Sequence, residues 1–244
     1  MQEESLFLKL AKCEFEKHKV EYLGLILDHD TIRPDPTKVM RLWEWPRTLK
    51  IVKDIQSTLG LLNYHRAFVP RFSHIVKLLT WLLKKGEPFI WTMNCTKALD
   101  QIIDILISEP VLTYLDPNKP FKLEMDASSF ATGAILFQRD ECRKPRPIGF
   151  HSETLLKEEI NYDIYNKKLT TLDQGLETWQ HLLLSNHMTI HMDHANLMFY
   201  HQPHKLSPRA KWVVAHIMQY DISIKHKLGL LNKADALSCQ PDYP

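Results

Sequence analysis

The stretch Phe121-Lys-Leu-Glu-Met-Asp126 decides how the second half of the chain folds, because apolar and polar side chains alternate strictly along it. Successive side chains of a β-strand point to opposite faces of a sheet, so Phe121 and Met125 predict a core-facing row and Asp126 falls on the other face. The segments 132–138 and 147–151 predict two more strands. Three consecutive antiparallel strands are therefore expected.

The remainder of this half predicts helices and strands in turn. A long helix is expected over about 158–185, where apolar residues recur at helical spacing. A strand over 188–193 ends, like the first strand, in an aspartate, and a helix and a fifth strand follow at 207–220 and 222–227. With a short terminal turn or helix over 234–239, the expected order is β-β-β-α-β-α-β-α. The apolar stripe of the long helix consists of Ile164, Leu169, Leu172, Leu176, Trp179 and Leu183.

The first half has a different pattern. The alternating run 20–27, followed by a proline-rich turn at 33–36, predicts a strand hairpin. Leucines and aromatic residues at helical spacing over 48–83, interrupted at Pro70, predict two or three short helices. A further helix is expected over 98–108, and the proline-rich connector after it is where we place the domain boundary.

The bulk composition is that of a globular chain. With 244 residues, of which 44% are apolar and 25% charged, the chain is long enough for two compact units that each bury a core. Its apolar runs fall far short of the roughly 20 residues that span a bilayer, so no membrane segment is predicted. The N-terminal residues carry no secretory signal pattern, and the four cysteines form no C-x-x-C pair. We therefore expect an intracellular protein, in the cytoplasm or the nucleus.

Positive charge is concentrated between Arg47 and Lys85, where eight basic residues accompany one acid, Asp54, although the net charge of the chain is only +2. By default, such a stretch is the solvated surface of helices. Because aromatic residues are interleaved with the basic ones, the stretch also predicts a surface that follows the phosphate backbone of a duplex. The basic residues that we single out for nucleic-acid binding are Arg47, Lys50, Lys53, Arg66 and Arg71.

Three short motifs, each with an aspartate, resemble in order and separation the three aspartate motifs of Ty3/gypsy-type RNase H domains. They are Met125-Asp-Ala-Ser-Ser-Phe-Ala-Thr-Gly-Ala-Ile-Leu136, Met192-Asp-His194 and Lys233-Ala-Asp-Ala-Leu-Ser238. The upstream half is similar to the same reverse-transcriptase polyproteins, so the resemblance covers essentially the whole chain. The upstream motifs include Lys12-Cys-Glu-Phe15, Glu21-Tyr-Leu-Gly24 and Leu59-Gly-Leu-Leu-Asn-Tyr64.

The resemblance implies an α/β (α+β) chain, with a helical thumb followed by an RNase H-like fold whose mixed five-stranded sheet is flanked by helices. Residues 1–46 are then the end of a palm with a strand hairpin like a primer grip, residues 47–118 the helical thumb and connector, and residues 119–244 the RNase H-like domain. The expected partners are an RNA/DNA hybrid or duplex nucleic acid and an upstream polymerase palm. The family's polymerase centre, a Tyr-x-Asp-Asp turn, does not occur in the sequence, so we do not expect the chain to polymerise DNA alone.

The resemblance also implies a ribonuclease site. RNA cleavage of this type uses two divalent cations, Mg²⁺ or Mn²⁺, which need hard oxygen ligands. Asp126, Asp193 and Asp235 match three of the four catalytic, metal-binding carboxylates of the family. The fourth is a glutamate on the first long helix, and the matching stretch here, Asn161-Tyr-Asp-Ile-Tyr-Asn-Lys-Lys168, has Lys168 in its place.

An ammonium at this position reverses a charge beside a site that must concentrate negative charge, and it competes with a cation for the aspartates. No residue three or four positions from Lys168 on the helix is acidic, and Asp163 and Asp173 are five residues away. Three hypotheses stay open: a degenerate, hybrid-binding fragment with weak or absent ribonuclease H activity, an active ribonuclease H that uses three aspartates, and a non-catalytic structural or interaction remnant.

Overall fold

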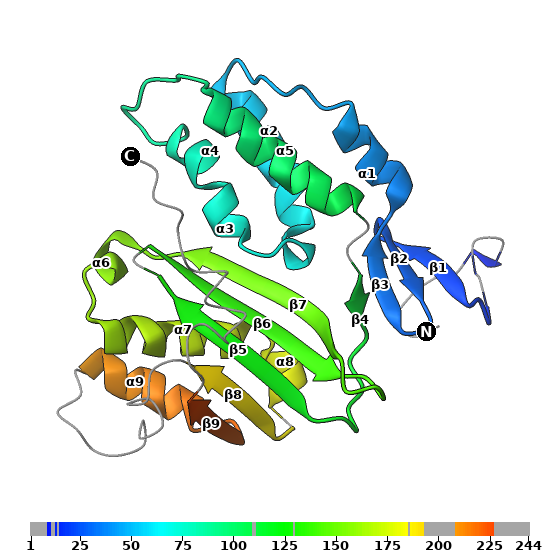
Figure 1. Ribbon diagram of the computed structural model, residues 1–244, viewed down its shortest axis with the longest axis vertical. Helices are drawn as coiled ribbons and strands as arrows, with labels where there is room; N and C mark the ends of the chain where they lie inside the picture. Colours follow the sequence, from blue (N-terminus) through cyan, green and yellow to red (C-terminus); the bar gives the residue numbers. More distant parts are fainter. Residues whose placement is uncertain are drawn as a thin grey trace.

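The computed structural model describes residues 9–10, 13, 15–108, 111–128, 130–184, 186–192 and 208–226, and these residues are built around two β-sheets. A four-stranded sheet belongs to the first half of the chain and a five-stranded mixed sheet to the second (Figure 1). Helices flank the five-stranded sheet, so the predicted fold class is confirmed.

The small sheet is antiparallel, in the order β1-β2-β3-β4. Strands β1 (Lys19–Tyr22) and β2 (Leu25–Asp28) form the hairpin that was predicted over 20–27. Strand β3 (Thr31–Pro34) runs into the segment predicted as a turn, and β4 (Leu112–Thr113) pairs with it from the connector. Backbone hydrogen bonds therefore tie the connector to the first part of the chain.

Helix α1 (Pro36–Trp43), which was not predicted, begins at the last residue of the segment 33–36 that was predicted as a turn. The Asp35 carboxylate caps it, because it accepts hydrogen bonds from the Thr37 backbone N–H at 2.9 Å and from the Thr37 hydroxyl at 2.8 Å. Proline is favoured at the first position of a helix, where its missing N–H is not needed. The run Asp35-Pro36 was therefore a helix-start signal rather than a turn signal.

The segment predicted to be helical over 48–83 contains three α-helices, α2 (Val52–Tyr64), α3 (Phe72–Ile75) and α4 (Lys77–Trp81), and one short 3-10 helix, η2 (Arg66–Phe68). Helix α5 (Met93–Ile107) begins five residues before the helix expected over 98–108. The apolar sides of these helices share one core with α1, centred on fully buried residues of α2 and α5 such as Ile55, Leu62, Leu99 and Ile102. We call residues 36–107 the helical unit.

The large sheet has the strand order β7-β6-β5-β8-β9. The first three strands are antiparallel to one another, as predicted, while β8 and β9 run parallel to β5. We call the described residues from 121 onward the sheet unit. Its strands are β5 (Phe121–Ala127), β6 (Ala131–Arg139), β7 (Pro145–Thr154), β8 (Met188–Met192) and β9 (Ile222–His226).

Four helices belong to the sheet unit: α6 (Lys157–Ile160), α7 (Ile164–Thr178), α8 (Gln180–Leu183) and α9 (Pro208–Ile217). The predicted helix over 158–185 is thus broken into three, and Ile164 of its expected stripe is 66% exposed because α7 begins there. Helix α7 crosses β5 closely: a Cβ atom at Gly175 would lie 2.7 Å from the Met125 sulfur. The absence of a side chain at Gly175 permits this approach.

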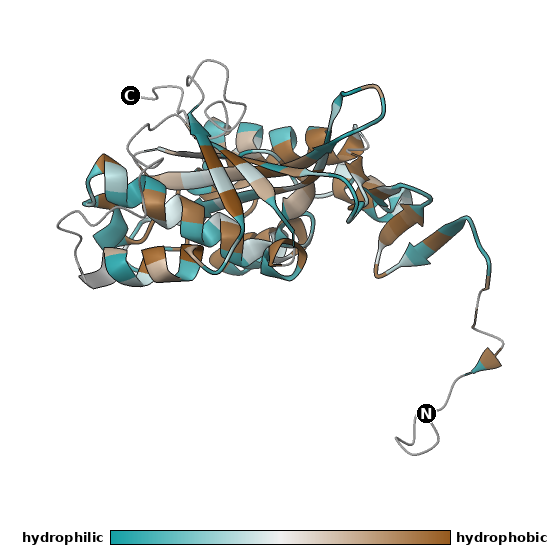
Figure 2. Cartoon of the chain, turned by 90° about the horizontal axis from the view of Figure 1, so that it is seen from below, coloured by the Kyte–Doolittle hydropathy of each residue, from teal (hydrophilic) through white to brown (hydrophobic). Residues whose placement is uncertain are grey.

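The helical unit lies beside β7, the strand at one end of the large sheet, and contacts it through η2 and α3 (Figure 1). Every residue of β6 from 131 to 138 is buried, as expected for a strand covered on both faces. Phe150 of β7 packs both against Ile135 and Phe137 of β6 and against the core of the helical unit. Figure 2 shows teal and brown residues alternating along the helices, the pattern of amphipathic helices that cover a core.

Candidate functional site

The aspartates singled out from the sequence belong to the ends of strands in the large sheet. The backbone of Asp126 is part of β5 and pairs with Gly133 on β6. Strands β5 and β8 are parallel and paired up to Glu124 and His191, and β8 ends at Met192. Parallel strands end at the same edge of a sheet, so β5 and β8 lead to one edge, which we call the carboxylate edge. The Asp126 side chain, Asp193 and Asp235 lie outside the described part of the structure.

A tight turn joins β5 to β6 at this edge. The Ser128 hydroxyl donates to the Ala131 carbonyl at 2.9 Å, and the Ala131 N–H donates to the same hydroxyl at 3.0 Å. One residue on, the Thr132 hydroxyl donates to the Gln174 side-chain oxygen of α7 at 3.0 Å. The turn that follows Asp126 is therefore ordered by its own hydrogen bonds and attached to α7.

Lys168 lies in the first half of α7 and is only 6% exposed. It precedes Gly175 by two helical turns, so both residues lie on the side of α7 that faces the sheet, as does the fully buried Leu172. Burying an ammonium is costly unless anionic or polar groups surround it. The position that the family resemblance gives to a carboxylate is thus occupied by a buried cation.

The nearest acidic residues along α7 have other roles. Asp163 caps the helix, where its carboxylate accepts a hydrogen bond from the Asn166 N–H at 2.7 Å. The Asp173 carboxylate lies 2.6 Å from Nδ1 of His216 on α9. Within the described ranges, no group of three or more His, Cys, Asp or Glu side chains is placed to hold a metal ion. Lys168, the described residue at the fourth position, brings no carboxylate to a cation site.

The five basic residues predicted to bind nucleic acid differ in their surroundings. Arg47 donates to the carbonyls of Leu42 and Trp45 at 3.0 and 3.2 Å and forms an ion pair with Asp100. Arg66 donates to the Ser152 carbonyl of β7 at 2.6 Å. Arg71 is half-buried in the left-handed backbone region before α3, whereas Lys50 and Lys53 are exposed at the start of α2. Whether any of the five binds nucleic acid stays a prediction.

Helix α2 has an exposed side without bulky residues at its centre. Gly60 is exposed in mid-helix, and a Cβ atom placed there would meet no other atom within 4 Å. Gln56 and Tyr64, one turn before and after it, are exposed on the same side. The Tyr64 hydroxyl donates to the Leu23 carbonyl in the β1–β2 turn. A backbone left bare in this way can be approached closely by a ligand.

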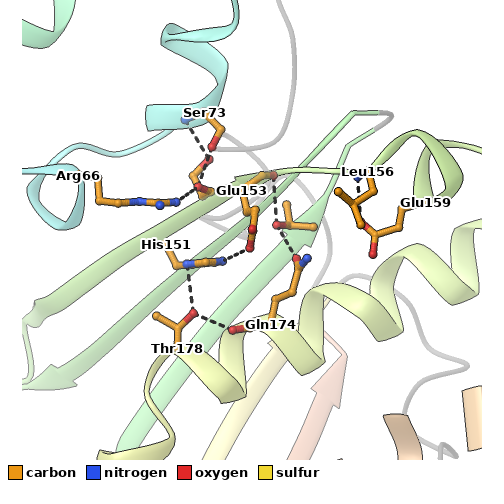
Figure 3. Close-up of polar contacts among 10 residues, drawn as sticks. Arg66, Ser73, His151, Glu153, Leu156, Glu159, Gln174 and Thr178 are labelled. Carbon is orange, nitrogen blue, oxygen red and sulfur yellow. Dashed lines mark hydrogen bonds and ion pairs between the residues drawn. The ribbon is translucent and has the colours of Figure 1, made fainter. Parts of the chain in front are cut away.

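The helical unit and the sheet unit meet through buried polar groups on β7 (Figure 3). The Ser73 hydroxyl donates to the Ser152 carbonyl at 2.6 Å, and both serines are buried. Burial, and to a smaller degree the Arg66 charge, lowers the pKa of His151 to about 4. Burial also lowers the pKa of His74 to about 4, aided by the charges of neighbouring basic residues. Both imidazoles are therefore neutral near pH 7.

A cavity of about 830 Å³ lies at the opposite end of the sheet. It is lined by the connector and by the β6–β7 turn, including Tyr114, Gln138 and Arg146. Gln138 stands at the far end of β6 from Gly133, the partner of Asp126. This cavity therefore does not belong to the carboxylate edge.

Several residues at the junction of the two units and on α2 were not singled out from the sequence. Ser73 and Ser152 belong to no recognised motif, and Phe130 lies inside the first aspartate motif without having been given a role. Only the pairing of strands and the packing of the two units bring the three residues together. Gly60 lies inside a motif that was recognised, but its exposure depends on which side of α2 is buried. A mid-helix glycine was the one sequence signal available for it.

Comparison with known proteins gives two kinds of match. The domain family described as the RNase H-like domain found in reverse transcriptase matches residues 91–190. The Tf2-3 and Tf2-4 transposon polyproteins of Schizosaccharomyces pombe are each 32% identical to this chain over 240 residues, which is 96% of the chain. The chain spans only 18% of the length of these polyproteins.

Solved structures share the fold. The foamy viral protease-reverse transcriptase in complex with an RNA/DNA hybrid superposes with a TM-score of 0.75 at 21% sequence identity, over 96% of this chain and 32% of that one. Its complex with double-stranded DNA gives a TM-score of 0.71 at 22% identity, over 86% of this chain and 45% of that one. The arrangement of both units is thus found in a solved reverse-transcriptase structure. No helix among the residues that the structure describes is long and apolar enough to cross a membrane.

Proposed function

We propose that this chain binds an RNA/DNA hybrid and cleaves its RNA strand weakly or not at all, because residues 91–190 match the RNase H-like domain found in reverse transcriptase and 96% of the chain is similar to retrotransposon polyproteins. Binding depends on the backbone and shape of the duplex rather than on its base sequence. The observation that carries the proposal is the burial of Lys168 on the sheet-facing side of α7.

The proposed division of labour follows the two units. Residues 1–46 are the end of a palm, residues 47–118 a thumb with its connector, and residues 119–244 the RNase H-like domain. The exposed side of α2 supports the thumb assignment, because Lys50 and Lys53 at its start offer charge to phosphates and Gly60 allows close approach. An upstream palm and an intracellular location belong to the same proposal.

Weak cleavage follows from electrostatics at the carboxylate edge. Divalent cations supply charge stabilisation in hydrolysis of this type, and they bind where carboxylates outnumber positive charges. Lys168 in place of a glutamate removes one negative charge and adds one positive charge. The net charge at this position is therefore more positive by two, which opposes cation binding. Asp163 and Asp173 do not restore the negative charge, because one caps α7 and the other pairs with His216.

The experiment is a gel-shift titration of the chain with an RNA/DNA hybrid, a DNA duplex of the same sequence and a non-nucleic polyanion. We expect the hybrid to bind more tightly than the polyanion, with an affinity that falls steeply with salt. Equal affinity for the hybrid and the polyanion, or no binding to the hybrid, would contradict the proposal. The matched variant is Lys50→Met combined with Lys53→Met, which removes two exposed charges at the start of α2 and should weaken binding to the hybrid.

A second candidate, an active ribonuclease H that uses three aspartates, is supported by one observation. Strands β5 and β8 are parallel and lead to the carboxylate edge. In the sequence, Asp126 is near the end of β5 and Asp193 directly follows the last residue of β8. A cleavage assay with Mg²⁺ or Mn²⁺ on a labelled hybrid tests it. Cleavage in the parent that disappears in Asp126→Asn would establish this function, whereas cleavage that persists in the variant would come from another source.

A further inference from the structure

One row of paired residues runs across the first three strands of the large sheet. Asp126 on β5 pairs with Gly133 on β6, and Gly133 pairs with Ser152 on β7. Strand β7 is at one end of the strand order, so Ser152 is on the edge strand of the described sheet. Two successive strand pairings therefore link the backbone of Asp126 to the edge strand β7.

The helical unit holds this row at Ser152. The Ser152 carbonyl accepts hydrogen bonds from Arg66 Nη2 and from Ser73 Oγ, each at 2.6 Å, and the Ser73 N–H donates to the Ser152 hydroxyl at 3.3 Å. Ser152 is 3% exposed and Ser73 7% exposed. An edge strand has unpaired backbone groups, and a buried carbonyl among them needs donors. Here the donors come from η2 and α3 of the other unit.

The helical unit also holds the β5–β6 turn. The Phe130 ring lies against His74 of α3, with ring centroids 4.4 Å apart, and Lys77 Nζ is 3.8 Å from the centre of the same ring. The Phe130 carbonyl accepts a hydrogen bond from the Leu155 N–H at 2.8 Å, which fastens the turn to the end of β7. The turn after Asp126 thus contacts α3, α4 and the end of β7.

From these two attachments we propose that Arg66 and Ser73 are positioning residues, which hold the row of paired residues that contains Asp126 in place through Ser152. His74 and Lys77 hold the β5–β6 turn in place through Phe130. The helical unit is then part of the scaffold of the carboxylate edge. Arg66, which was singled out as a candidate nucleic-acid ligand, thus also has an intramolecular role. The consequence for hybrid binding rests on the proposed function: a duplex held by the helical unit meets the carboxylate edge at a fixed distance.

The test is amide hydrogen exchange on the full chain without nucleic acid. Ser73→Ala and Arg66→Met each remove one donor to Ser152, and exchange at the amides of Ser128 and Ala131 should accelerate roughly fivefold or more, as expected for loss of a buried hydrogen bond. Ser57→Ala, an exposed serine of α2, is the matched control and should change nothing. Arg66→Lys, which keeps a donor, should restore most of the protection.

Two results would overturn the proposal. In the first, exchange accelerates around Ser73 and Ser152 while Ser128 and Ala131 stay as in the parent, so the contact is local. In the second, every element of both units accelerates equally, so the contact contributes only to global stability.

Hybrid titrations then separate this proposal from the proposed function. Ser73→Ala should weaken binding to a hybrid of about 20 base pairs, which is long enough to contact both units. It should leave a hybrid of about 6 base pairs unaffected, because that duplex occupies one unit only. If the parent binds no hybrid, the proposed function fails, while the exchange result still decides the role of Arg66 and Ser73.

Discussion

The Arg47 guanidinium lies 2.7 Å from the Asp100 carboxylate and so joins the segment after α1 to α5. The same guanidinium donates to three carbonyls at or just beyond the end of α1, those of Leu42, Trp43 and Trp45. Helix ends leave carbonyls without partners, and a basic side chain can satisfy them. The charge of Arg47 therefore already serves the helical unit itself.

Replacing Arg47 should consequently affect stability. Arg47→Met should lower the free energy of unfolding by about 1–3 kcal/mol, because carbonyls and a carboxylate lose a charged donor. Urea unfolding at pH 7 measures this loss. At temperatures where the variant stays folded, the salt dependence of hybrid binding should match that of the parent. A shallower salt dependence with unchanged stability would show that Arg47 contacts phosphate.

Lys53→Met should give the opposite result. Lys53 is exposed near the start of α2, so its removal should leave the urea midpoint unchanged. If its ammonium neutralises one phosphate, the slope of log affinity against log salt should become shallower by about 0.9. Lys97→Met, an exposed lysine of α5, is the matched control. Equal slopes for Lys53→Met and the parent would remove Lys53 from the interface.

The strands of the large sheet were predictable from local pattern, and their partners were not. Strict alternation from Phe121 to Asp126 marks β5 because one face is core. No local sequence pattern indicates that β8 is parallel to β5, or that Ser152 lies in the same row of paired residues as Asp126. Both features depend on the pairing of strands that are far apart in the sequence. The break before Ile164 was missed because a continuous apolar stripe does not reveal where a helix restarts.

The candidate site was predictable where chemistry follows from residue type. Lys168 in place of a carboxylate was readable from a motif, and its burial agrees with a sheet-facing position. For Arg47 and Arg66, charge alone did not show that their guanidinium groups donate to backbone carbonyls. These hydrogen bonds depend on which backbone groups the fold brings near each side chain.

Gly60→Ala should raise stability and lower hybrid affinity at the same time. Alanine is favoured over glycine inside a helix by about 1 kcal/mol, and open space around Gly60 accommodates the methyl group. If the α2 backbone approaches the duplex, that methyl group should reduce affinity roughly fivefold or more. Thermal unfolding and hybrid titration measure the two effects. Gln101→Ala on α5 is the control, and unchanged affinity in Gly60→Ala would exclude close approach at this position.

Acidification should weaken the junction between the two units before the carboxylates titrate. The pKa values of His74 and His151 fall from 6.5 to about 4 on folding, so the unfolded chain takes up protons first as pH falls. Their contribution to stability is therefore complete above about pH 6.5 and declines towards pH 4, with an upper bound of about 1.4 kcal/mol per pH unit for each histidine. The pKa of Asp35 is lowered from 3.8, so this carboxylate titrates below that window.

Urea unfolding between pH 7 and pH 4.5 measures this slope. His151→Gln, which cannot be protonated in this range, should have a shallower dependence of stability on pH than the parent. His181→Gln, at an exposed position of α8, serves as the control and should retain the parental slope. Identical slopes for all three proteins would mean that the junction histidines do not govern the acid response.

Lys168→Glu should make the carboxylate edge responsive to divalent cations. The substitution replaces a buried ammonium by a carboxylate on the sheet-facing side of α7, so Mg²⁺ should raise the melting temperature of the variant and leave the parent unchanged. Without Mg²⁺ the variant should melt below the parent, because an added anion is buried without its cation. Lys167→Glu, one residue away at a less buried position, carries the same charge change and should not respond. A Mg²⁺ response in the parent, or none in Lys168→Glu, would mean that Lys168 does not decide cation binding.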